Sequence, residues 1–169
     1  MRRMPPIFDA LASELAGKVV YLAFDVPVVV LLALVLRPEF HLTLSGGLLF
    51  LPALLLAWAL RFFWGYCLAL LAFWATRADA LLGLQDALIF LLAGQVAPVT
   101  LLPGVLGTAA RILPFRYMVA FPVEVLTGQA TGTALATGFV FQAAWLLLAV
   151  ILYRVVWHKG LRRYAAVGG

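Results

Sequence analysis

The chain has 169 residues, 66% of them hydrophobic and only 11% charged, with a formal net charge of +5. Soluble domains carry about 25% charged residues, so a soluble fold of this size would lack the polar groups needed to cover its surface. Most of the cations flank apolar segments, where they suit lipid headgroups, so we expect an all-α integral membrane protein that contacts lipid and binds no nucleic acid.

Residues 5–18 predict a short amphipathic helix at the N-terminus. One face of this helix carries the apolar side chains of Ile7, Phe8, Leu11 and Leu15. The rest of its circumference carries the polar side chains of Asp9, Ser13, Glu14 and Lys18. The segment is too short and too polar to cross a bilayer. We therefore expect it to lie at the membrane surface or against a partner.

Two apolar segments follow, residues 19–36 and 48–75, and with two later segments they predict about four membrane-crossing helices. The first would be about 27 Å long as a helix, and it is interrupted only by Asp25 and Pro27. The second, at about 42 Å, exceeds the thickness of the bilayer core, so it must tilt, bend or protrude.

A charged residue, Arg61, lies inside the second apolar segment. Placing an arginine in the middle of a membrane costs about 2.5–3.5 kcal/mol, so the side chain needs a partner, water or a headgroup. An ion pair with Asp25 or Asp86, or snorkelling towards a headgroup, is the preferred interpretation. Contact with a substrate is the alternative.

The same segment is rich in aromatic residues. Trp58, Phe62 and Tyr66 are candidates to line a substrate path together with Arg61, and they would favour a hydrophobic or amphipathic substrate. Lipid contact or packing between helices remains the preferred interpretation of these rings.

Residues 80–97 form a third apolar segment, which carries Gln85 and Asp86. A proton relay between Asp25 and Asp86 is one hypothesis, since carboxylates inside a membrane are costly and often functional. Both lie about 9 Å from the end of their segment. Solvation at a helix end, or hydrogen bonding between helices, is therefore the preferred interpretation.

A stretch rich in proline and glycine, residues 98–128, separates the third segment from the last one, residues 134–157. Proline interrupts helices, so a regular membrane-crossing helix cannot continue through it. Because the stretch is mostly apolar, we expect short broken helices that dip into the membrane or lie on it. The last segment would be about 36 Å long as a helix and is the clearest of the four.

The distribution of basic residues predicts the orientation. With four crossings, one side of the membrane receives Arg2, Arg3, Lys18, Arg77, Arg154, Lys159, Arg162 and Arg163, and the other receives Arg37, Arg111 and Arg116. Basic residues are more frequent on the cytoplasmic side, so both termini are expected in the cytoplasm and residues 98–128 outside.

Catalytic and metal-binding patterns are not apparent. His41 and His158 fall in separate short segments, and the only cysteine, Cys67, excludes a multi-cysteine metal site. Neither Lys18 nor Lys159 belongs to a G-x-x-x-x-G-K-[ST] loop, so we expect no ATP site and no bound cofactor in this chain.

The order of these segments resembles the type-2 ATP-binding-cassette (ABC) exporter permeases. In that family, re-entrant extracellular helices before the last membrane-crossing helix carry a pattern of glycine, proline, a second proline, and proline with an aromatic residue. The matching residues here are Gly94, Pro98, Pro103, Pro114, Phe115 and Pro122. The basic end of the chain, residues 160–169, is similar to a bacterial subfamily of these permeases.

The resemblance implies a permease subunit of the bacterial inner membrane. It would form the translocation path with a second permease, either an identical copy or a paralogue, and a separate subunit would hydrolyse ATP. The N-terminal helix, with Phe8, Asp9, Leu11 and Glu14, would contact that ATPase subunit. A helix bound only to lipid is the alternative.

Members of this family have six membrane-crossing helices, whereas this chain offers about four. Residues 1–18 match the cytoplasmic segment that follows the second of the six. A truncated gene, a fragment or a start codon assigned too late would explain the difference. An accessory or truncated membrane protein that assembles with other subunits without transporting is therefore the alternative function, and a membrane-embedded enzyme ranks last, because polar residues are scattered.

Overall fold

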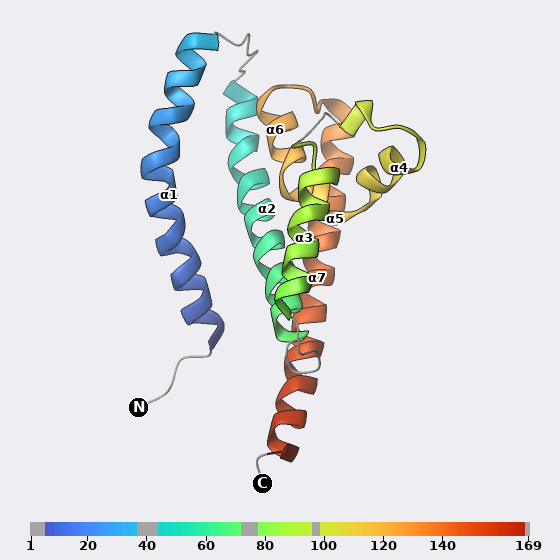
Figure 1. Cartoon of the computed structure of the whole chain (residues 1–169). Coiled ribbons are helices and arrows are strands. Elements are labelled where there is room, and N and C mark those ends of the chain that lie inside the picture. Colours follow the sequence, from blue (N-terminus) through green and yellow to red (C-terminus); the bar gives the residue numbers. More distant parts are fainter. Residues whose placement is uncertain (1–5, 37–43, 72–77, 96–98, 168–169) are drawn as a thin grey trace. The chain divides into compact units, whose positions relative to one another are not determined.

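The computed structural model describes residues 6–36, 44–71, 78–95 and 99–167. In these ranges the regular elements are all helical (Figure 1): α1 Pro6–Leu36, α2 Leu44–Leu70, α3 Ala78–Leu92, the 3₁₀ helix η2 Val99–Leu101, α4 Gly104–Ile112, α5 Pro114–Met118, α6 Ala120–Leu126 and α7 Gly132–Val167. By length and composition α1, α2 and α7 can each cross a membrane, and α3 is a shorter apolar helix. The predicted all-α membrane fold is confirmed.

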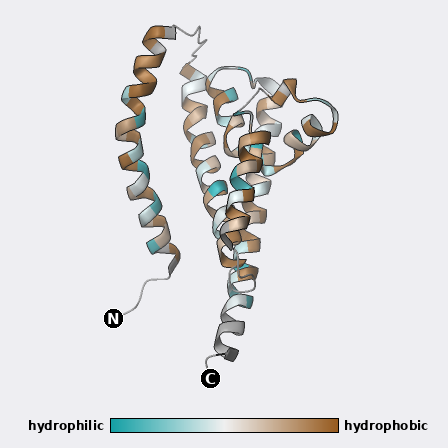
Figure 2. Ribbon diagram, viewed as in Figure 1, coloured by the Kyte–Doolittle hydropathy of each residue, from teal (hydrophilic) through white to brown (hydrophobic). Residues whose placement is uncertain are grey.

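The chain forms two units, Met1–Phe40 and His41–Gly169. The first contains α1, a single helix of 31 residues that is hydrophobic along most of its length (Figure 2). The sequence predicted an amphipathic helix ending at residue 18 and a separate membrane-crossing helix from residue 19. Instead the helix continues, because residues 15–22 contain no proline, and Glu14 and Lys18 form an ion pair one turn apart, at 3.8 Å.

In the second unit α2 packs against both α7 and α3, while the short helices α4 to α6 gather near the end where α2 and α7 begin (Figure 1). Helix α2 starts at Leu44 and ends at Leu70, so it begins and stops earlier than predicted. Residues 72–75 of that prediction lie outside the described residues.

Helix α3 is shorter than the predicted membrane-crossing segment. It ends at Leu92 and is followed by a turn in which Gly94 has a φ of 78°, a conformation that favours glycine. Its 15 residues span about 22 Å, less than the usual thickness of the hydrocarbon core. Residues 96 and 97 of the predicted segment are outside the description.

Helix α7 has 36 residues and extends the predicted segment at both ends. It begins at Gly132, whose φ is 53°, and no proline follows to stop it. Its apolar part, Gly132–Gly160, is long enough to cross the membrane.

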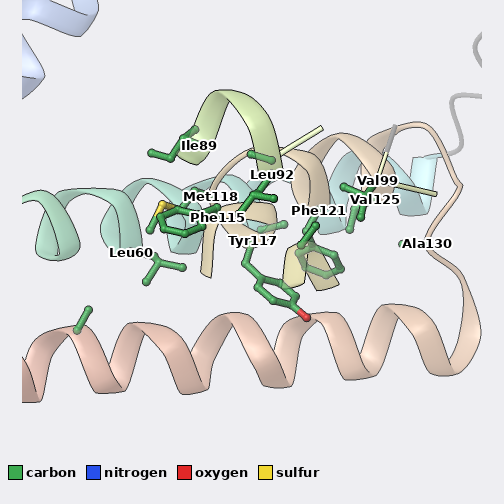
Figure 3. Packing of buried hydrophobic residues seen from close by; sticks show 14 residues of the cluster. Leu60, Ile89, Leu92, Val99, Phe115, Tyr117, Met118, Phe121, Val125 and Ala130 are labelled. Atoms are coloured by element: carbon green, nitrogen blue, oxygen red, sulfur yellow. The ribbon is translucent and has the colours of Figure 1, made fainter. Parts of the chain in front are cut away.

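The core of the second unit lies where α5 and α6 insert among α2, α3 and α7. Figure 3 shows its buried side chains, which include Leu60 of α2, Ile89 and Leu92 of α3, Phe115, Tyr117 and Met118 of α5, and Phe121 and Val125 of α6. Close packing of this kind drives helix association in membranes, where lipid is as apolar as the side chains. The short helices are therefore an integral part of the packed unit.

Candidate functional site

Residues 99–128 fold into the predicted short helices, and each break has a local cause. Pro103 precedes α4 in an extended conformation, and Leu113 is extended before Pro114, the first residue of α5. Pro122 lies in the first turn of α6, where no hydrogen bond is lost. The prediction of broken helices is confirmed here, while Pro98 lies outside the described residues.

An ion pair joins α5 to α6. Arg116 Nη2 donates to Glu124 Oε2 at 2.7 Å and Arg116 Nε donates to Glu124 Oε1 at 3.3 Å. The two side chains are only 26% and 19% exposed. This two-point geometry is the strongest form of an arginine–carboxylate contact. Sequence reasoning did not find the pair, because a helix break lies between its two members.

A buried glutamine ties the short helices to two long ones. Gln142 of α7 is fully buried, and its Nε2 donates to the carbonyl oxygen of Ala53 in α2 at 2.9 Å and to that of Tyr117 in α5 at 3.0 Å. From the sequence it was noted only as an interruption of the last apolar segment. The sequence could have indicated this contact, because an unpaired amide in a membrane is costly and Gln142 therefore needs a hydrogen-bond partner inside the protein.

Two further hydrogen bonds use carbonyls at the end of α4. Trp145 Nε1 of α7 donates to Ile112 O at 2.9 Å, and the Tyr117 hydroxyl donates to Arg111 O at 2.8 Å. Carbonyls at the C-terminal end of a helix have no partner within that helix, so they are available for such bonds. Together with Gln142 they fix α4 and α5 to α7.

Arg61 of α2 is paired with Asp86 of α3. Arg61 Nη2 lies 3.4 Å from Asp86 Oδ1, and the two side chains are 45% and 64% exposed. The sequence left Asp25 and Asp86 open as partners; the structure pairs Arg61 with Asp86, and Asp25 belongs to the other unit. The two helices approach closely beside this pair, because Gly65 leaves room for the buried amide of Gln85.

The three aromatic candidates form a ladder on α2. The Trp58 and Phe62 rings stack with centroids 6.0 Å apart, and Phe62 and Tyr66 stack at 5.8 Å. Residues four apart lie one above the other on a helix, which explains the alignment. The ladder extends to α7, where the ring of Tyr153 meets that of Tyr66 with centroids 5.6 Å apart. The structure thus places Trp58, Phe62 and Tyr66 together, with Phe62 buried at 8% exposure, whereas Arg61 reaches Asp86 of α3 from another face of α2.

The N-terminal candidates belong to the other unit. Asp9 O accepts a hydrogen bond from Ser13 Oγ at 2.7 Å, Leu11 is partly buried, and Glu14 pairs with Lys18. The side chain of Phe8 is outside the description. Across the described ranges, no group of three or more His, Cys, Asp and Glu residues could hold a metal ion.

A family model described as "ABC-2 family transporter protein" matches residues 4–168. The chain belongs to this family. No curated protein and no solved structure matches it. The family is a transport component of ABC transporters, which makes the chain a multi-pass membrane protein of the ABC-2 permease type and confirms the resemblance found in the sequence.

Proposed function

We propose that this ABC-2 family chain is the membrane-spanning permease subunit of an ABC-type exporter, and that it forms a substrate path driven by a separate ATP-hydrolysing subunit. The match to the family over residues 4–168 carries the proposal. ATP is used by the partner, and this chain holds no cofactor. The protein resides in the bacterial inner membrane with both termini in the cytoplasm, paired with a second permease that is an identical copy or a paralogue.

The substrate path runs along α2 past Arg61, Trp58, Phe62 and Tyr66. The exposed Arg61–Asp86 pair supports this placement, because charges inside a membrane are costly where they face lipid and are tolerated where they face water or a bundle interior. The partly exposed rings of Trp58 and Tyr66 provide apolar surface for the rest of a substrate, and the buried ring of Phe62 is stacked between them.

The short helices close the outer end of this path. The re-entrant motif residues Gly94, Pro98, Pro103, Pro114, Phe115 and Pro122 mark the segment. Gln142 of α7 donates to Tyr117 O of α5 and to Ala53 O of α2, which supports a gating role, because a movement of α7 relative to α2 is transmitted to α5. Such two-state coupling through packed elements is how a conformational change travels across a protein.

The first turns of α1, with Phe8, Asp9, Leu11 and Glu14, contact the ATPase subunit. The unbroken helix from Pro6 to Leu36 supports this role, since a continuous helix carries movement from its polar end into its apolar part without a hinge. Asp9 and Glu14 are exposed and available to a partner.

Co-purification tests the proposal. The full chain is tagged and expressed with a candidate ATP-binding-cassette ATPase from the same genome, and recovery of that subunit and its ATPase activity are measured. We expect recovery with the wild type, loss with Glu14→Lys, and wild-type recovery with Asp25→Asn, a matched control further along α1. Failure to recover any ATPase subunit with the wild type would refute the coupled permease and favour an accessory membrane protein.

A further inference from the structure

A partly open groove of about 170 Å³ lies between α2 and α7. Its α2 side follows one stripe of that helix, with spacings of three and four residues, and its α7 side consists of two residues one turn apart. The lining residues are Trp64, Cys67, Leu68, Leu71, Leu152 and Val156. None of these six is charged. The groove therefore offers apolar surface that the protein's own side chains do not fill.

The cysteine adds no free polar group to this surface. Cys67 is 8% exposed, and its thiol donates a hydrogen bond to the carbonyl oxygen of Ala149 at 3.4 Å. A buried thiol of this kind behaves as a small apolar residue. Apolar cavities of about 150 Å³ stay dry and bind hydrocarbons such as benzene. A hydrocarbon chain is therefore the occupant that suits the groove.

The groove lies close to one boundary of the membrane. Helix α2 ends at Leu70, and the apolar part of α7 that can cross a membrane ends at Gly160. Val156 precedes that end by about 6 Å of helix. A phospholipid with its headgroup at this boundary therefore has the upper part of its acyl chain beside the groove.

A cation lies at the boundary end of the groove. Leu152, Val156 and Lys159 are four and three residues apart, so they share one face of α7. Long side chains on a helix lean towards its N-terminus, which brings Lys159 over the turn that contains Val156. Lys159 is exposed, and within the described ranges no carboxylate forms an ion pair with it. Its charge is therefore available to an anionic group at the end of the groove.

We propose that this groove binds an anionic phospholipid of the surrounding bilayer. One acyl chain fills the space between α2 and α7, and the anionic headgroup pairs with Lys159. Basic pockets between membrane helices are known to hold anionic lipid headgroups. An apolar helix of another subunit would fill the groove but leave the lysine without a counter-charge, so charge complementarity favours the lipid. The lipid stays bound to the chain, and the proposal does not depend on the permease function.

Lipid titration of the full-length chain tests this assignment. The chain is purified in detergent, and phosphatidylglycerol or phosphatidylcholine with identical acyl chains is added in steps. Mass spectrometry of the intact protein under non-denaturing conditions measures how many lipids each copy binds. We expect the first phosphatidylglycerol to bind about fivefold more tightly than the first phosphatidylcholine, which is the effect of one basic residue near an anionic headgroup.

A surface variant tests the headgroup contact. Lys159→Gln should remove the preference for phosphatidylglycerol and leave the affinity for phosphatidylcholine unchanged. Arg154→Gln is the matched control, because Arg154 is also exposed on α7 but lies on the face opposite Leu152 and Val156. This control should keep the wild-type preference. A preference that survives in Lys159→Gln, or that both variants lose equally, would overturn the headgroup contact.

A second pair of variants tests the groove itself. Val156→Phe fills part of it and should weaken both lipids by about tenfold, the effect of excluding about two methylene groups from an apolar site. Val155→Phe adds the same ring at an exposed residue outside the lining and should keep wild-type affinities. Lys159→Gln still tests the site if Val156→Phe does not fold, because it changes only a surface residue.

Three further results would overturn the proposal. Equal affinities of the wild type for the two lipids would show that no anionic headgroup is recognised. Unchanged lipid binding in a folded Val156→Phe variant would show that the lipid binds elsewhere. Loss of a two-copy species in that variant, with lipid binding unchanged, would show that a second copy of the chain fills the groove.

Discussion

Substitution of Gly138 by alanine should weaken the contact between α6 and α7. A methyl group at this position would lie within 2.7 Å of three ring atoms of Phe121, whereas ordinary carbon contacts are about 3.5–4.0 Å. Phe121 is only 1% exposed, and its ring meets the edge of Phe139 at 5.2 Å. The ring therefore cannot move aside without displacing other buried side chains.

The expected cost follows from two opposing effects. Forcing an extra methyl into a packed core costs about 1–3 kcal/mol. Replacing glycine by alanine inside a helix stabilises the folded state by about 1 kcal/mol, because alanine has the higher helix propensity. We therefore expect Gly138→Ala to destabilise the protein by up to about 2 kcal/mol, which corresponds to a fall in Tm of up to about 4–8 °C for a chain of this size.

The single cysteine provides the assay. Cys67 of α2 is 8% exposed and its thiol donates to Ala149 O of α7 at 3.4 Å, so a thiol-reactive fluorescent dye labels it when these helices separate. Gly83→Ala is the matched control, because nothing lies within 4 Å of the added methyl, and its Tm should equal or slightly exceed that of the wild type. Adding Phe121→Leu to Gly138→Ala should restore part of the loss. Equal Tm values for Gly138→Ala and Gly83→Ala would refute the packing argument.

Three further predictions concern the short helices. Gln142→Leu removes two hydrogen bonds, each worth about 0.6 kcal/mol in a membrane, and should lower stability by about 1 kcal/mol in the same labelling assay; a more stable variant would contradict the role of the amide. Glu124→Gln leaves Arg116 without its charged partner and should cost about 1–3 kcal/mol, with partial recovery when the two charges are exchanged. Burial raises the pKa of Tyr117 above its usual value of 10.0, and the effect of Glu124 adds to this while that of Arg116 opposes it. Since the neutral phenol is favoured in the folded state, this stabilisation is complete below pH 10 and is lost as the pH rises through the raised pKa. Tm measurements between pH 9 and 12, at roughly one-unit steps, should therefore fall less steeply for Tyr117→Phe than for the wild type.

Composition and proline positions account for most of the fold that was predictable. Long apolar segments identify membrane-crossing helices, because backbone groups in lipid must bond within their own segment. The prolines of residues 98–128 predicted that no regular helix runs through this stretch, and in the structure α4 starts directly after Pro103 and α5 starts at Pro114. The expected break at residue 18 is absent because amphipathic patterning describes which face is polar and contains no signal that ends a helix.

The sequence by itself thus determined the helical membrane class, the positions of the apolar segments and the family. The tertiary structure decided which polar groups meet: Asp86 for Arg61, Glu124 for Arg116, and two carbonyls for Gln142. These partners lie on separate elements, and spacing along the chain predicts contacts only within one helix. Their pairing depends on how the short helices insert among α2, α3 and α7, which is set by close packing at residues such as Gly138 and Phe121.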